Sequence, residues 1–240
     1  TGYSLHFLPE GATTYQQYLQ QNTYSLNWVL RSLGYRCNAT HPYYASGWNR
    51  TTAYPLLGFS QSTFIDDYPR NNLIREYVSD QEMFEYLLDA LEQSQESPQF
   101  LFGVTMQNHG DYGFLEDNLD EYIYLENYKS DYPQAESYLT LIHESDKALE
   151  YLLTQLQQSE KKTIVLFFGD HLPKLESAFY EEVHGGSFSN LEDLMLQYTV
   201  PFFIWANYDI PEREGLYISS SFLSPLLLDC ANAPMSEHQT

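Results

Sequence analysis

The sequence predicts an α/β fold in which a mostly parallel β-sheet is sandwiched between helices. Segments with helical spacing alternate with short apolar runs, in the order helix, strand, helix, strand, helix, strand. The central runs are continuously apolar, which is typical of strands that are buried on both faces. Since the 240 residues contain no internal repeat and no low-complexity linker, residues 1–240 are predicted to form a single domain.

The first elements follow from spacing and from turn residues. Residues 13–34 carry apolar side chains at helical spacing and the pattern stops at Gly34, so one helix is predicted there. Residues 35–44, YRCNATHPYY, predict a short strand that runs out into a loop. Residues 46–72 are rich in Gly, Pro, Asn and Ser and predict a long loop with one short helical turn, a kind of segment that is often functional.

The middle of the chain predicts a helix, a strand and a loop. Residues 79–97 open with a capping box, Ser79 followed by Glu82, and continue with a helical apolar pattern. Residues 99–106 form a short apolar run with polar neighbours, as in a buried strand. Residues 107–133 are acidic and rich in Tyr, and are predicted to form a loop.

The last part continues the alternation. A second long helix is predicted at 134–158, and a strand at 162–169. A further apolar run at 198–206 contains Pro201, which indicates an edge strand or the start of a strand. Residues 219–233 predict a terminal helix.

The charge balance restricts the partners. The chain has 33 acidic and 11 basic residues, a net charge of −22, which argues against general affinity for nucleic acid or an anionic membrane. An anionic substrate would need a metal ion or a positioned arginine. Cys37 and Cys230 are too few for a disulfide framework; two free buried thiols are favoured over a bond between them.

No stretch approaches the roughly 18 apolar residues of a membrane-spanning helix, and the start of the chain does not read as a signal peptide. The first residue is Thr rather than Met. We therefore expect the chain to be a piece of a longer protein, whose targeting or anchoring segment lies upstream.

Three histidines directly follow predicted strands. His41 follows the first strand, Asn108 and His109 follow the second, and Asp170 and His171 follow the third. Because ligands of parallel α/β sheets bind beyond the carboxyl ends of the strands, these side chains are expected at one edge of the sheet. Asp and neutral imidazole together suit zinc or manganese, so the pattern indicates a metal or phosphate site.

Two further residues lie close to His41. Arg50 presents a planar fork that suits phosphate or sulfate oxygens, and Trp48 can cover the apolar side of a small polyol. Taken alone, both also fit ordinary loop residues that pack onto the surface. His184, in a loop with two glycines, is a weaker candidate for covering a site. No Ser or Thr lies in a GxSxG elbow or beside a recognisable base.

These motifs together resemble a known family. GDHLP after an apolar strand, Asn-His after the preceding strand, HPYYASGWNR and the opening TGYSLHFLPEGATTYQQYL are similar to the sulfatase and alkaline phosphatase superfamily, in its lipoteichoic acid synthase-like branch. The resemblance implies an alkaline phosphatase-like fold. It implies that Asp170 and His171 are metal ligands, and that the glycerol phosphate head group is held by His41, Trp48, Arg50 and His109.

The resemblance also implies what lies outside this chain. The family holds a divalent cation, commonly manganese, with zinc, magnesium or calcium as alternatives. Its nucleophilic Thr and a Glu ligand belong upstream of Thr1. We therefore expect a catalytic domain truncated at its N-terminus, inactive alone, from a phosphoglycerol transferase on the extracellular face of a bacterial membrane, anchored by upstream transmembrane helices.

Competing interpretations remain at this point. The same intermediate could pass to a cell-surface polymer as acceptor or to water, so a sulfate or phosphate ester hydrolase is the first alternative. The second is a non-catalytic domain that binds an anionic polyol or a wall polymer. In each case the expected ligand is glycerol phosphate or another anionic ester, and no nucleic acid is expected.

Overall fold

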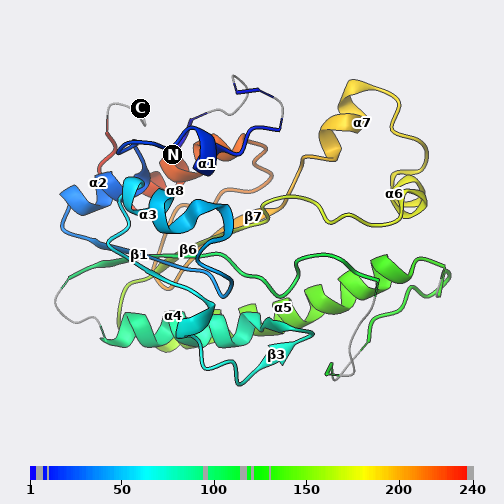
Figure 1. Cartoon of the computed structure of the whole chain (residues 1–240), viewed down its shortest axis with the longest axis horizontal. Coiled ribbons are helices and arrows are strands. Elements are labelled where there is room, and N and C mark those ends of the chain that lie inside the picture. Colours follow the sequence, from blue (N-terminus) through cyan, green and yellow to red (C-terminus); the bar gives the residue numbers. More distant parts are fainter. Residues whose placement is uncertain are drawn as a thin grey trace.

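The computed structural model describes residues 1–3, 8–9, 11–93, 97–113, 118–119, 122–129 and 131–236. Strands occupy the centre and helices lie on both sides of them, so the predicted α/β sandwich is confirmed (Figure 1). Residues 4–7 and 10 of the opening stretch, and parts of the acidic segment, lie outside the described residues.

A parallel sheet of three strands, in the order β2-β1-β5, carries the first two histidine loops. Strand β1 (Arg36–Thr40) pairs on one side with β2 (Gln61–Thr63) and on the other with β5 (Gln99–Gly103). Thr40 is in register with Thr63 and with Gly103, so all three strands end at the same edge. The strands predicted from 35–40 and 99–106 are confirmed.

The third histidine loop follows a separate pair of strands, so the expectation that all three histidine loops leave one edge of the same sheet is wrong for Asp170 and His171. Strand β6 (Ile164–Phe168) pairs with β7 (Phe202–Ala206), and this pairing is antiparallel. Strand β7 begins directly after Pro201, as expected for a residue that cannot donate to a ladder. Most side chains of β5, β6 and β7 are half-buried, so the expectation of strands buried on both faces is wrong for the described residues.

One helical layer covers the face of the sheet that is uppermost in Figure 1. It contains α2 (Leu26–Ser32), α3 (Arg50–Leu56) and α8 (Leu223–Cys230), the predicted terminal helix. Their apolar side chains pack with β1 and β5 in one cluster, which includes Leu30, Cys37, Ala39, Ala53, Tyr54, Leu57, Phe59 and Leu228. Both cysteines are free and buried, as the sequence analysis favoured.

The opposite layer consists of two long helices, α4 (Asp80–Gln93) and α5 (Pro133–Gln158), at the positions predicted for them. They pack against each other and against β6 and β7, in a cluster that includes Phe84, Ala148, Leu152, Leu156, Val165, Phe167 and Trp205. The predicted capping box of α4 is half formed. The Glu82 amide donates to the Ser79 hydroxyl at 3.1 Å, whereas the Glu82 carboxylate accepts from the amides of Arg70 and Asn72, each at 2.6 Å.

Two predictions for the first third of the chain are wrong. Residues 13–34 form two short helices, α1 (Thr14–Gln17) and α2, rather than one. Tertiary hydrogen bonds interrupt the helix, because the Ser25 hydroxyl donates to the Leu57 carbonyl at 2.5 Å and the Thr23 amide donates to the Leu56 carbonyl at 3.0 Å.

The segment predicted as a long loop, 46–72, is also more ordered than expected. It contains helix α3, strand β2 and two 3-10 turns, Gly47–Asn49 and Ile65–Asp67. Strand β2 is only three residues long and polar, so it has no apolar run that would reveal it.

Three smaller features complete the fold. Strands β3 (Leu73–Ile74) and β4 (Tyr77–Val78) form an antiparallel hairpin below the main sheet. Helices α6 (Ser177–His184) and α7 (Leu191–Leu196) form an arm that extends away from the sheet (Figure 1). A 3-10 turn (Ser220–Phe222) leads into α8. Within the described part of the chain, no helix is long and apolar enough to cross a membrane.

Candidate functional site

His41 is a buried, neutral imidazole at the carboxyl end of β1. Its side chain is 2% exposed, and its Nδ1 lies 2.7 Å from the carbonyl oxygen of Val104, just beyond β5. Because that oxygen can only accept, Nδ1 carries the proton and Nε2 is an acceptor. The pKa of His41 is lowered to about 4, mainly by burial; the charges of Arg50 and His109 lower it further, against the hydrogen bond to Val104.

The loops after β1 and β5 leave the same edge of the sheet, since Thr40 is in register with Gly103 and His41 Nδ1 is bonded to the Val104 carbonyl. The charges of Arg50 and His109 both act on the His41 imidazole. His109 is exposed, and its Nδ1 lies 2.8 Å from the Gly110 carbonyl. The sequence predicted His41 and His109 at one edge of the sheet, and the register of β1 with β5 places their loops there.

Arg50 is held by a tight turn. Trp48 and Asn49 both adopt the left-handed conformation, with φ of 55° and 56°, and the chain then enters α3 at Arg50. The Arg50 guanidinium donates to the Gly47 carbonyl at 3.1 Å. A Cβ atom on Gly47 would lie 2.7 Å from Arg50 Nη1, so only glycine leaves room for this arrangement. The Trp48 ring is 58% exposed and free to cover a ligand.

Asp170 and His171 form an exposed pair directly after β6. Their side chains are 80% and 73% exposed, and Asp170 Oδ2 lies 3.6 Å from His171 Nε2. His171 Nδ1 lies 2.8 Å from the Leu172 carbonyl, which leaves the lone pair on Nε2, beside the carboxylate. The two side chains therefore present one oxygen and one nitrogen donor toward a common point.

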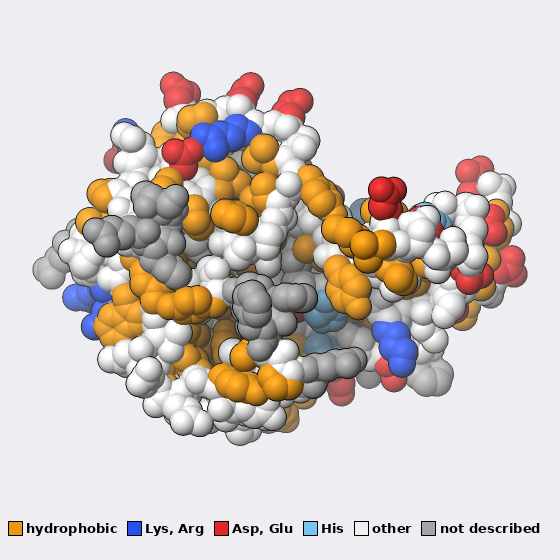
Figure 2. Space-filling view, turned by 90° about the horizontal axis from the view of Figure 1, so that it is seen from above, with side chains coloured by type: hydrophobic (Ala, Val, Ile, Leu, Met, Phe, Trp, Pro, Cys, Tyr) orange, Lys and Arg blue, Asp and Glu red, His pale blue; other side chains and the backbone are white. Residues whose placement is uncertain are grey.

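The Asp170 loop adjoins the His109 loop. Burial raises the pKa of Tyr112 to about 12, and the negative charge of Asp170 adds to this shift. Tyr112 belongs to the loop after β5, and its hydroxyl donates to the Asn108 carbonyl at 2.8 Å. Figure 2 shows histidine side chains at the bottom of a hollow between the arm of α6 and α7 and the rest of the molecule.

The donor set of Asp170 and His171 fits a divalent cation, although it is incomplete. A carboxylate and an imidazole whose other nitrogen is hydrogen-bonded to a carbonyl are usual ligands of zinc and manganese. No group of three or more His, Cys, Asp or Glu side chains that could hold a metal ion occurs among the described residues. The pair can thus supply two ligands of a cation.

Arg75 is the part of the site that the sequence analysis missed. It lies between β3 and β4, is 8% exposed, and its guanidinium donates to the carbonyls of Gln107 and His109, each at 2.7 Å, and of Asp111 at 2.8 Å. It therefore fixes the loop that carries His109. The only sequence signal is a lone arginine inside LIREYV, which does not identify its partners.

His184 does not join the site. It lies at the end of helix α6, so the prediction that it lies in a loop is wrong. Its Nε2 is 3.3 Å from an Asp193 carboxylate oxygen, and its ring stacks on Phe188 at 4.5 Å. These contacts lie within the arm and give His184 a structural role there.

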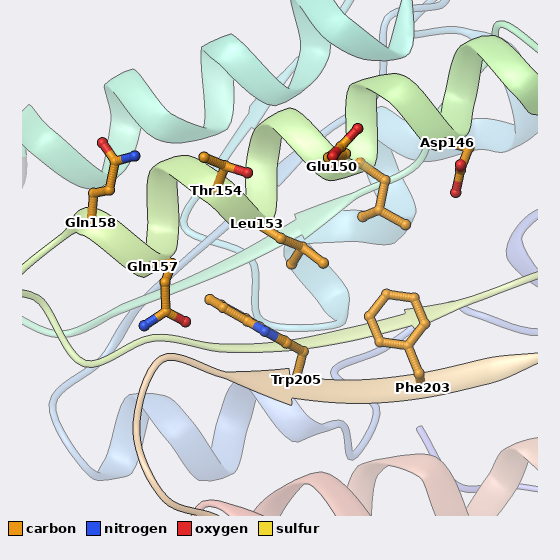
Figure 3. A pocket seen from close by; sticks show the side chains of 9 residues that line it. Asp146, Glu150, Leu153, Thr154, Gln157, Gln158, Phe203 and Trp205 are labelled. Carbon is orange, nitrogen blue, oxygen red and sulfur yellow. The ribbon is translucent and has the colours of Figure 1, made fainter.

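An open groove of about 550 Å³ lies elsewhere, between α5 and β7. Leu153, Phe203 and Trp205 face one another across it (Figure 3). None of the predicted site residues lines this groove, and its polar side chains, which include Asp146 and Glu150, are not grouped for catalysis.

Comparison with known proteins identifies related sequences. The family model for sulfatases matches residues 1–233. A candidate cyclic beta-1,2-glucan modification protein of Rhizobium meliloti is 29% identical over 239 residues, 95% of this chain and 36% of that protein. The capsular polysaccharide biosynthesis protein RkpI of the same organism is 30% identical over 62% of this chain and 26% of its own length. The chain thus spans well under half of either relative.

Solved structures show the same fold. The Streptococcus pyogenes phosphoglycerol transferase GacH, in complex with sn-glycerol-1-phosphate, has a TM-score of 0.64 and 27% identity, covering 86% of this chain and 52% of GacH. The lipoteichoic acid synthase LtaP of Listeria monocytogenes has a TM-score of 0.65 and 21% identity, covering 85% and 49%. A Vibrio parahaemolyticus protein of the alkaline phosphatase superfamily has a TM-score of 0.67 and 18% identity, covering 92% and 50%.

Proposed function

Because this chain belongs to the sulfatase family, we propose that it is part of a metal-dependent phosphoglycerol transferase that modifies a glycan at the bacterial cell surface. In the net reaction, the phosphorus–oxygen bond to the donor breaks, a bond from phosphorus to an acceptor hydroxyl oxygen forms, and the acceptor proton passes to the departing oxygen. GacH supports the transferred group, and the names of the two Rhizobium relatives support a glycan acceptor.

One observation carries this proposal: the loop with His41 and Arg50 leaves the sheet at the same edge as the loop with His109, and the 2.7 Å hydrogen bond of His41 Nδ1 to Val104 ties the two loops and holds His41 neutral. The guanidinium and His109 would bind phosphoryl oxygens and stabilise the charge that develops on them. Nε2 of His41 would accept a hydrogen bond from a hydroxyl of the glycerol, and the exposed Trp48 ring would cover its carbon atoms. A set of one cation, one neutral acceptor and one aromatic face suits a phosphorylated polyol better than a planar aryl sulfate.

Asp170 and His171 would supply two ligands to a divalent cation, with manganese as the first candidate and zinc, magnesium and calcium as alternatives. Bound there, the cation would neutralise phosphoryl oxygens and lower the pKa of an attacking hydroxyl. We propose that the remaining ligand and the nucleophilic threonine come from a segment upstream of Thr1. Residues 1–240 would then form one domain that is inactive without that segment.

We also place the domain on the outer face of the membrane, held by upstream helices. The similar fold of EcEptC from Escherichia coli, whose matching part is described as a C-terminal periplasmic domain, supports this placement (TM-score 0.56, 15% identity). The net charge of −22 fits a domain that stands clear of anionic lipids and reaches their head groups only at the site.

Calorimetric titration with sn-glycerol-1-phosphate tests the proposal directly. The chain should bind it, and Arg50→Ala should weaken binding about tenfold or more, because the guanidinium contributes a charge-assisted bond of roughly 1.5–3 kcal/mol. Arg213→Ala is the matched control, since Arg213 pairs with Asp229 on the surface. Equal binding by the Arg50 variant would return Arg50 to a structural role. Release of free sulfate from aryl sulfates by the longer protein would favour the hydrolase instead.

A further inference from the structure

Three tyrosines, which we call the tyrosine platform, join the two histidines of the head-group site. The Tyr43 ring centroid lies 6.0 Å from that of His41, and the Tyr77 centroid lies 6.4 Å from both Tyr43 and His109. Tyr44 extends the row, with its centroid 4.9 Å from Tyr43. The rings of Tyr43 and Tyr77 therefore connect His41 to His109.

The platform is held in place by the backbone. The Tyr43 amide donates to the His41 carbonyl at 2.7 Å, and its carbonyl accepts from the Ile65 amide at 3.1 Å. Tyr77 begins strand β4, and the guanidinium of Arg75 lies 5.2 Å above its ring. Arg75 also donates a hydrogen bond to the His109 carbonyl, so it holds the β3–β4 hairpin against the loop that carries His109.

Packing of the core does not account for these rings. Tyr43, Tyr44 and Tyr77 are absent from the hydrophobic clusters that the described residues form. Tyr43 and Tyr77 are half-buried, and Tyr44 is 57% exposed. Aromatic rings that are fixed but not fully covered, beside a few polar groups, are typical of the walls of ligand sites.

The chemistry of the platform points to a neutral ligand rather than to the phosphate. Arg50 lies at the start of α3, beyond the loop of Tyr43 and Tyr44, and Glu76 shares a hydrogen bond with the Tyr77 hydroxyl. A carboxylate at this place disfavours an anionic polymer, whereas it can accept hydrogen bonds from sugar hydroxyls. Tyrosine offers an apolar face for the carbon–hydrogen side of a sugar ring and a hydroxyl for its rim.

We propose that Tyr43 and Tyr77, extended by Tyr44, form the subsite for the acceptor, and that the acceptor presents a neutral sugar ring there. This inference rests on the proposed transferase function, because it takes His41, Arg50 and His109 as the neighbouring head-group site. A sugar ring packed against Tyr43 and Tyr77 would hold its hydroxyls next to a phosphoryl group bound by Arg50 and His109. The platform would thus select a sugar over water or an anionic polymer as acceptor.

The test compares two ligands by NMR titration of the intact chain: a neutral gluco-oligosaccharide and sn-glycerol-1-phosphate. We expect the oligosaccharide to bind, and Tyr43→Ala and Tyr77→Ala each to weaken it about fivefold or more. Tyr43→Phe and Tyr77→Phe keep the ring face, so their affinity should stay within about twofold of the parent. In each alanine variant, affinity for sn-glycerol-1-phosphate should fall less than affinity for the oligosaccharide.

Tyr198→Ala is the matched control, because Tyr198 is 85% exposed and lies next to the arm. Absence of oligosaccharide binding by the parent chain, or equal binding by the alanine variants, would overturn the platform. Loss of oligosaccharide affinity in the phenylalanine variants as well would assign binding to the hydroxyls and also contradict ring stacking. Retained oligosaccharide binding without any binding of sn-glycerol-1-phosphate would instead refute the proposed transferase.

Discussion

The guanidinium of Arg75 donates to the backbone carbonyl of His109 at 2.7 Å, so a buried cation from the β3–β4 hairpin holds a proposed ligand-binding histidine. The same group binds the carbonyls of Gln107 and Asp111. Asn118 fixes the hairpin in turn, since its side chain bonds the backbone of Leu73 and Arg75. The loop after β5 thus owes its shape to a residue more than thirty positions earlier in the chain.

Replacing Arg75 should therefore damage both stability and binding. Arg75→Lys keeps the charge but cannot reach three carbonyls with a planar fork, so at least one buried carbonyl loses its partner, at about 1–3 kcal/mol. Urea unfolding should show this loss, and sn-glycerol-1-phosphate should bind more weakly. Arg70→Lys is the control, because the Arg70 side chain is exposed. Unaltered stability and binding in Arg75→Lys would contradict a positioning role.

Gly47→Ala should weaken head-group binding without removing a charge. The added methyl group would lie 2.7 Å from Arg50 Nη1, so the end of this flexible side chain must shift from its place beside the Gly47 carbonyl. We expect a loss of affinity for sn-glycerol-1-phosphate that is smaller than the loss in Arg50→Ala, because the shifted guanidinium keeps its charge. Ser46→Ala changes an exposed neighbour in the same turn and should bind normally. Parent-like affinity in Gly47→Ala would show that Arg50 acts from another position.

The sequence predicted much of this arrangement, because apolar runs and strand-end histidines are local signals. Continuous apolar runs identified β5 and β6, and the parallel α/β rule placed His41 and His109 at the same edge. The motif that contains Arg50 predicted its nearness to His41. These predictions hold because each depends on a few consecutive residues and on the register of neighbouring strands.

Features that depend on long-range partners escaped prediction. Strand β2 is short and polar and exists through its pairing with β1, and helix α2 starts late because Ser25 bonds Leu57. The antiparallel pairing of β7 with β6 needs knowledge of the arm between them. Arg75 is the strongest case, since its three acceptors are carbonyls, which carry no side-chain signal in the sequence.

Asp170→Ala and His171→Ala should each abolish metal-dependent activity of the longer protein while leaving the fold intact. Both side chains are largely exposed, so their loss removes a ligand and little packing. Activity with and without added manganese, together with thermal unfolding, separates the two effects. His184→Asn is the matched control and should keep activity, because His184 binds Asp193 within the arm. Full activity in either alanine variant would refute the metal-site assignment.

Stability between pH 4 and pH 6.5 should depend on two buried groups that act in opposite directions. The pKa of His41 is lowered to about 4 in the folded chain, so the unfolded chain binds a proton first on acidification and the fold loses stability as pH falls from 6.5 to 4. Burial raises the pKa of Asp80 to about 6, so the folded chain binds a proton first and gains stability over a similar range. The two effects therefore oppose each other as the pH falls.

Removing one group should expose the other. Asp80→Asn leaves the His41 effect unopposed, so its stability relative to the parent should fall on acidification from pH 6.5 to pH 4. His41→Asn leaves the Asp80 effect, so its relative stability should rise over the same range. Urea unfolding of all three chains in half-unit pH steps measures this, and comparison with the parent cancels the common contribution of the exposed carboxylates. If the free energy of unfolding changes with pH in the same way for all three chains, neither group has the shifted pKa that its burial predicts. His41 would then not be held neutral in the site.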